Sequence, residues 1–266
     1  MYLRIHFTHQ SWESRLFPKL SNSSSFLEIS ARAEKISDND INGVINTSKA
    51  IMTVATTNAR DIFRSAYENR YTWDEGFPGY TADIILTQGE EVHTGKIQVN
   101  ADYSVEVTGI DDEKVQESIY NQMRDIVTHR KRGNFDASHG KNQFNFGQDD
   151  PTGALEILVT GDAMGSNYKV RGQEICQVSR VMGPMAFTIN TEESLDTGEG
   201  YISIRYNAIF RNAKTNELKG KRDFKETYEK IGNYYLPSCQ VINAIDAGGE
   251  KSTTEFTFIN LQLLES

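Results

Sequence analysis

Apolar and polar residues alternate along most of the second half of the chain. Segment 202–210 is the clearest example, and its alternating apolar positions are Ile202, Ile204, Tyr206, Ala208 and Phe210. A period of two is typical of a strand that buries one face. Comparable segments run from Leu155 to Leu263. About eight strands are therefore expected in this part of the chain.

Three more segments with a period of two lie between Tyr80 and Val107. Short polar turns at 88–90 and 100–102 separate them. Strands joined by such short turns pair as antiparallel neighbours. The region therefore predicts an antiparallel meander of three strands.

Two segments have the period of a helix. The first begins at Thr57 or Asn58 and runs to about Arg70, and the second runs from Asp111 or Asp112 to about Arg130. Both start at residues that accept hydrogen bonds from the first free backbone N–H groups of a helix. Residues 133–153 are dominated by Asn, Asp, Gly, Ser and Gln, and a loop is expected there.

No linker rich in proline and glycine divides these elements. The simplest arrangement is one large, curved antiparallel sheet of about 10–11 strands, a half-barrel, with two main helices on its concave side. The fold class is α+β. The sequence thus predicts one sheet-rich domain over residues 52–266.

Residues 1–51 differ in composition from the rest. They carry six basic and five acidic side chains, a net charge of +1, whereas residues 52–266 carry 22 basic and 32 acidic ones, a net charge of −10. Charged residues at Glu13, Arg15 and Lys19 interrupt any signal-peptide core. The segment is predicted to be a poorly structured leader. It is either an organelle transit peptide or not part of the native protein, with Met52 as the true start.

The composition excludes several classes of protein. The chain has 266 residues, 38% of them apolar, and a net charge of −9. The negative charge argues against nucleic-acid binding, which depends on neutralising phosphates. No stretch approaches the ~18–20 apolar residues of a membrane-spanning helix. A soluble, acidic protein is expected.

The sequence contains no motif typical of an enzyme. Cys176 and Cys239 are 63 positions apart, and no histidine has a second metal ligand at a typical spacing. A role without catalysis, metal or cofactor is therefore expected. Two buried, reduced thiols are consistent with the cytoplasm, or with the plastid stroma if the leader is a transit peptide.

Two groups of residues are candidates for contact with a ligand or partner. Aromatic residues gather where the first helix meets the first strand and again before Pro237, and they could line an apolar cavity or pack as ordinary core. They are Tyr67, Tyr71, Trp73, Phe77, Tyr80, Tyr234 and Tyr235. A basic run could contact an anionic lipid surface or an acidic partner, or could simply be a solvated helix end. It consists of His129, Arg130, Lys131 and Arg132.

Several motifs in order resemble a family of uncharacterised proteins of cyanobacteria and plastid-bearing organisms, catalogued as a domain of unknown function. They are the segments 59–73, 77–83, 198–201, 228–235 and 252–256. The resemblance covers about residues 52–263, and chains of that family begin close to Met52. More loosely, the first helix, Gly95 in the second strand and the late Tyr-Tyr-Leu-Pro237 strand resemble the half-barrel of LolA-like lipoprotein carriers. That likeness implies a fold that holds lipid between sheet and helices.

Two functions are compatible with these observations. The first is non-enzymatic binding of a hydrophobic or amphipathic small molecule, such as a lipid, pigment or isoprenoid, between sheet and helices. The second is an assembly or interaction factor of photosynthetic complexes, with a filled core and protein partners. An apolar cavity would favour the first and a filled core the second.

Overall fold

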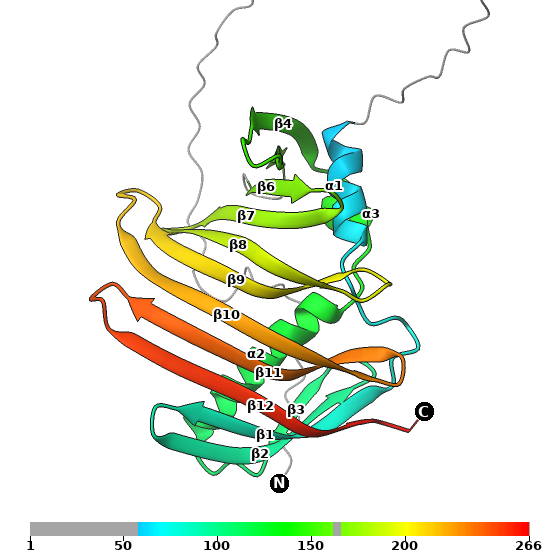
Figure 1. The fold of residues 1–266 in the computed structure, drawn as a ribbon, viewed down its shortest axis with the longest axis vertical. Coiled ribbons are helices and arrows are strands. Elements are labelled where there is room, and N and C mark those ends of the chain that lie inside the picture. Colours follow the sequence, from blue (N-terminus) through cyan, green and yellow to red (C-terminus); the bar gives the residue numbers. More distant parts are fainter. Residues whose placement is uncertain (1–57, 162–165, 266) are drawn as a thin grey trace, which may run out of the picture. The chain divides into compact units, whose positions relative to one another are not determined.

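The computed structural model describes residues 58–161 and 166–265. This part of the chain forms three helices and twelve strands (Figure 1). The helices are α1 (Ala59–Glu68), α2 (Glu113–Arg130) and α3 (Phe135–His139). The strands are β1 (Gly79–Gln88), β2 (Glu91–Asn100), β3 (Val105–Thr108), β4 (Gln143–Asp149), β5 (Leu155–Thr160), β6 (Ser166–Arg171), β7 (Glu174–Met182), β8 (Met185–Asp196), β9 (Tyr201–Asn212), β10 (Leu218–Ile231), β11 (Tyr234–Asp246) and β12 (Lys251–Leu263). The predicted leader, residues 1–51, lies outside the described residues.

All twelve strands join one open, antiparallel sheet. Its order is β3-β2-β1-β12-β11-β10-β9-β8-β7-β6-β5-β4, so that the first meander pairs with the last strand of the chain. The predicted α+β half-barrel is confirmed, with one or two more strands than expected. None of the described helices is long and apolar enough to cross a membrane.

The loop expected over residues 133–153 is wrong, because α3 and β4 occupy most of it. Asn134 caps α3 by accepting a hydrogen bond from the N–H of Ala137 at 3.0 Å. A helix of five residues is too short to be stable alone. It forms here because Phe135 is buried against α1 and lies 6.1 Å from the ring of Phe63.

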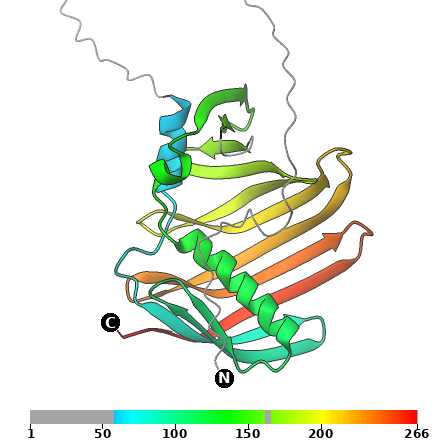
Figure 2. The same ribbon diagram turned by 180° about the vertical axis from the view of Figure 1, so that it is seen from behind.

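The two longer helices begin where the sequence predicts. Asn58 caps α1, and Asp112 caps α2 by accepting hydrogen bonds from the N–H groups of Lys114 and Val115. Helix α2 leads the chain away from β3, at one edge of the sheet, toward β4 at the other (Figure 2). Its 18 residues extend about 27 Å, whereas twelve strands are about 53 Å across. One helix therefore covers only part of the concave face.

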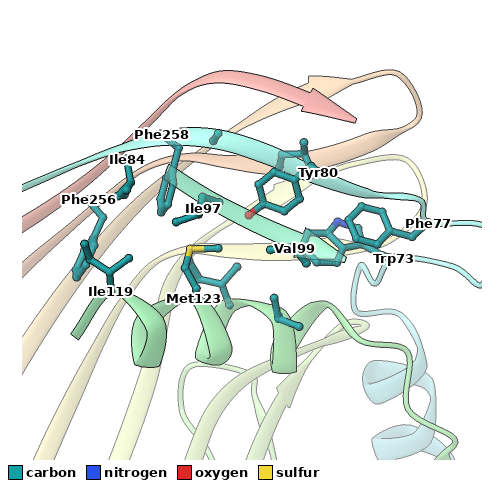
Figure 3. Packing of buried hydrophobic residues seen from close by; sticks show 14 of the residues in the cluster. Trp73, Phe77, Tyr80, Ile84, Ile97, Val99, Ile119, Met123, Phe256 and Phe258 are labelled. Carbon is teal, nitrogen blue, oxygen red and sulfur yellow. The ribbon is translucent and has the colours of Figure 1, made fainter. Parts of the chain in front are cut away.

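Each end of the concave face has its own hydrophobic core. The α2 core joins α2 to β1, β2, β11 and β12, and Figure 3 shows Ile119 and Met123 of the helix facing Ile97 and Phe258 of the sheet. The α1 core joins α1 and α3 to β4, β5 and β6 around Phe63, which is 1% exposed. Both helices lie on the same face of the sheet. Tyr168, which packs in the α1 core, points to the same side as its strand partner Val178 and the next partner, Ile189, and this is also the side of Tyr228, the hydrogen-bond partner of Arg130 of α2.

Candidate functional site

Six of the seven aromatic residues expected to line a cavity lie together in the α2 core. Tyr71, Trp73, Phe77 and Tyr80 are all at most 2% exposed. The rings of Trp73 and Phe77 stack at 4.2 Å, and Tyr234 meets the edge of Phe77 at 5.0 Å. Figure 3 shows Trp73, Phe77 and Tyr80 side by side where the segment after α1 meets the sheet. These side chains fill the junction by packing against one another.

Hydrogen bonds between side chains and the backbone of Tyr235 hold the same junction together. The indole N–H of Trp73 donates to the carbonyl of Tyr235 at 3.2 Å, and the N–H of Tyr235 donates to the hydroxyl of Tyr71 at 2.9 Å. Tyr67 lies elsewhere, in the α1 core, where its ring is 5.6 Å from that of Phe135. Contact of these seven residues with a ligand stays a prediction.

The basic run at the end of α2 does not form one surface. Arg130 is buried, contrary to the expectation of a surface contact, and its guanidinium donates to the carbonyl of Tyr71 at 3.1 Å and to the hydroxyl of Tyr228 at 3.2 Å. His129, Lys131 and Arg132 are exposed, and the ammonium of Lys131 lies 5.2 Å from the ring of Tyr103. Arg130 points inward because it follows Ile126 and Val127 on the buried face of the helix.

Arg130 leads into a buried polar network on the concave face. Glu226 of β10 accepts hydrogen bonds from the hydroxyls of Tyr228 and Tyr206 and from the amide of Gln240, each at 2.6 Å. Burial raises the pKa of Tyr206 well above its usual value, and the nearby carboxylate raises it further. The hydroxyl therefore stays protonated as a donor. Arg130 Nε and Gln240 Oε1 have no hydrogen-bond partner among the described residues, whereas the Glu226 carboxylate accepts three hydrogen bonds that hold it in place.

Between the two cores, strands β7 to β10 bear apolar side chains that belong to neither hydrophobic core. The strand register places these residues on the concave face, together with Tyr228, which accepts a hydrogen bond from Arg130, and Glu226. We call this set the central face, and it consists of Met182, Met185, Phe187, Ile189, Tyr206, Ala208, Phe210 and Phe224. All but Ala208 are half-buried, and none belongs to either core.

The opposite face of the same strands is polar. The amide of Gln177 donates to Asn190 at 2.7 Å, and Asn190 donates to Asn207 at 2.9 Å, forming a ladder across β7, β8 and β9. Ser179 and Thr188 are hydrogen-bonded beside it at 3.0 Å. The strands are thus strongly two-sided. A two-sided strand normally buries its apolar face.

Two arginines project from the central strands onto the concave face. Arg180 of β7 donates to the hydroxyl of Tyr168 at 2.6 Å, and the guanidinium of Arg222 of β10 lies 5.5 Å from the ring centre of Phe210. Asp125 of α2 is the acidic side chain close to Arg222. Burial raises the pKa of Asp125, while the charges of Arg124 and Arg222 lower it in part.

Two hollows in the described part of the chain are lined mainly by polar residues. One, of about 390 Å³, lies among β1, β2, β3 and β12 beside the Asp83–Lys96 ion pair, and the other, of about 370 Å³, lies near Asn69 and Glu174. Neither is the predicted apolar cavity between the sheet and α2. In that region the described side chains pack together in the α2 core.

Both cysteines are free and half-buried. Burial raises the pKa of each thiol, and the charge of Glu255 adds to this effect at Cys239. A raised pKa keeps a thiol protonated and poorly nucleophilic. Both thiols are therefore poor nucleophiles.

Comparison with solved structures finds similar chains at very low identity. The chain is similar to a LolA superfamily protein from Nitrosomonas europaea (10% identity, TM-score 0.32, covering 79% of this chain and 95% of that one). It is also similar to a lipoprotein-sorting protein domain from Vibrio parahaemolyticus, described as putative (11% identity, TM-score 0.30, 77% and 93%). A third similar structure is a DUF1329 family protein from Desulfovibrio piger (9% identity, TM-score 0.27, 78% and 94%).

A search among curated proteins finds no significant match. A family model, in contrast, matches residues 54–264, which is nearly the whole sheet-bearing part of the chain. The chain therefore belongs to the DUF3386 family, described as proteins of unknown function.

Proposed function

We propose that this protein binds a long hydrophobic or amphipathic small molecule, such as a lipid, pigment or isoprenoid, along the central face, without catalysing a reaction. The observation that carries the proposal is the row of half-buried apolar side chains between the two packed cores. Large apolar side chains that stay in contact with water on one surface mark a binding site for an apolar partner.

The composition of the central face fits a small ligand. Tyr206 and Phe224 stack face to face at 4.5 Å between ring centres with their planes 12° apart, and they add aromatic contact area beside the Ile189–Ala208 pair. Each Å² of apolar surface removed from water contributes about 25 cal/mol. A ligand lying on several such side chains would gain a large part of its affinity from them.

The ligand's place differs from the one that the sequence predicts. The space between α2 and the sheet is filled by the α2 core, so that region leaves no room for a long molecule. The central face offers the surface instead. Hydrogen bonds fix the position of Tyr206 on this face. Its hydroxyl donates to Glu226, which also accepts hydrogen bonds from Tyr228 and Gln240.

Native mass spectrometry of the protein after exposure to a lipid and pigment mixture tests the proposal. The informative variant is Ile189→Gln on the central face, and its matched control is Ile209→Gln, on the outer face of the neighbouring strand. We expect retained ligand with the unmodified protein and the control, and about tenfold weaker uptake by Ile189→Gln. Failure of the unmodified protein to retain any ligand would refute the proposal.

An interaction role, such as an assembly factor of photosynthetic complexes, is the second candidate. It is favoured by the openness of the central face, which a helix or strand of another protein could also cover. A pull-down from a photosynthetic extract separates the two candidates. A stoichiometric partner that is lost with Ile189→Gln and kept with Ile209→Gln would support the second one.

A further inference from the structure

We infer that the ligand of the central face is a long-chain carboxylic acid whose head group is held by Arg222. The inference rests on the proposed function and adds the chemical class of the ligand. Three features of the central strands carry it: the position of Arg222, the small side chains beside it and the aromatic row that leads away from it.

Arg222 occupies a position where the strand pattern calls for an apolar side chain. It alternates with Phe224 and Glu226 on β10, and both of these face the concave side. Its own side chain is exposed. An exposed guanidinium on this face can pair with an anionic group of a molecule that lies on the neighbouring apolar side chains.

The neighbours of Arg222 leave room for a head group. The residues opposite it on β9 and β11 are Ala208 and Ala244, the smallest side chains in their rows. A guanidinium can donate two parallel hydrogen bonds to a carboxylate. Alanine on both sides lets a carboxylate approach the guanidinium in this geometry without displacing a larger side chain.

An aromatic row extends from the arginine across the sheet. The guanidinium of Arg222 lies over Phe210, and Phe210 is paired with Phe187 at 6.5 Å between ring centres. Phe187 is in turn paired with Arg180 of β7. Two cations thus flank two aromatic rings across four adjacent strands of an acidic protein, whose net charge is −9.

Asp125 of α2 is an acidic side chain near Arg222. It is close enough to Arg222 for the arginine to lower its pKa, which burial raises. A bound acid would therefore compete with Asp125 for the guanidinium. Removing this carboxylate should tighten the binding of an acid and leave that of an uncharged molecule unchanged.

Fluorescence titration with cis-parinaric acid and with its uncharged methyl ester tests the inference. The unmodified protein should bind the acid more tightly than the ester. Arg222→Gln should weaken the acid about tenfold and change the ester less than twofold, because a charge-assisted hydrogen bond is lost only with the acid. Lys225→Gln is the matched control, since Lys225 is an exposed cation on the outer face of the same strand. Asp125→Asn should tighten the acid alone.

Each of the other outcomes has a definite meaning. Equal binding of acid and ester, unchanged in Arg222→Gln, would overturn the inference and leave the proposed function standing. Absence of binding by both probes, or binding only at concentrations where the acid aggregates, would also overturn the inference. Retention of another ligand in the mass spectrometry experiment would then show that the proposed function stands without it. Circular dichroism of each variant establishes that it is folded.

Discussion

The two ends of the concave face and its centre are built from strands with the same alternation of apolar and polar residues. At the ends, a helix lies on the apolar side chains, and strand residues such as Ile157 and Phe258 are at most 3% exposed. In the centre, Phe187, Phe210 and Phe224 project from the same face but remain half-buried. The presence of a covering helix, and not the strand pattern, decides which apolar residues become core.

The lengths of the elements explain this difference. Helix α1 has 10 residues and α2 has 18, whereas the sheet has twelve strands. Each helix can cover only a few strands, because neighbouring strands are about 4.8 Å apart. The central face lies between the strands that pack against the two helices, and we propose it as the functional surface.

Truncating a phenylalanine should have very different effects at the ends and in the centre. Phe63→Ala and Phe258→Ala each remove a buried ring and should lower the free energy of unfolding by about 3–5 kcal/mol. Phe210→Ala removes a half-buried ring and should cost about 1 kcal/mol or less. Urea unfolding followed by circular dichroism measures all three. Equal losses at the three positions would show that the centre is core.

Removing the buried cation should also be costly. Arg130→Met leaves the carbonyl of Tyr71 and the hydroxyl of Tyr228 without this donor, and a loss of about 3 kcal/mol is expected. Arg132→Met, at an exposed position two residues later, should change stability by less than about 0.5 kcal/mol. The same unfolding experiment measures both variants. A similar loss in the free energy of unfolding for the two would contradict a stabilising role of the buried Arg130 hydrogen bonds.

The α1 core should make stability depend on pH through His139. Burial among aromatic rings and, to a smaller extent, the charges of Arg180, Arg70 and Arg60 together lower the pKa of His139 to about 4. The unfolded chain takes up this proton near pH 6.5, whereas the folded one does not until about pH 4. Stability therefore falls as the pH drops from about 6.5 to about 4, by about 2 kcal/mol at pH 5.

His139→Gln isolates this contribution. The variant should lose less stability than the unmodified protein between pH 7.5 and pH 5, because the carboxylates titrate equally in both. Parallel curves of stability against pH would mean that His139 has no lowered pKa.

The sequence predicts much of the sheet, since alternation at residues such as Ile202 to Phe210 directly reports a two-sided strand. It also locates the starts of α1 and α2, because Asn58 and Asp112 cap them through local hydrogen bonds. Helix α3 and strand β4 could not be predicted in this way. Their stability comes from burying Phe135 and Phe144 against α1, which is distant in sequence.

The site is harder to predict than the fold for the same reason. Adjacent cations suggest a surface, yet Arg130 is drawn inward by partners on β10 that are about a hundred residues away in sequence. Tyr67 and Tyr71 are four residues apart and join different cores. The alternation of apolar residues on the central face is as clear in the sequence as that of the other strands. Only the structure shows that these residues belong to neither hydrophobic core.

Photo-crosslinking with a diazirine-bearing long-chain fatty acid tests the central claim most directly. Mass spectrometry of the digested protein then identifies the labelled residues. The account predicts labels on β7 to β10, within 182–189, 206–210 and 222–224, that excess unlabelled fatty acid removes. Labels concentrated on α2 or on the polar outer face, or labels that excess fatty acid does not remove, would contradict it.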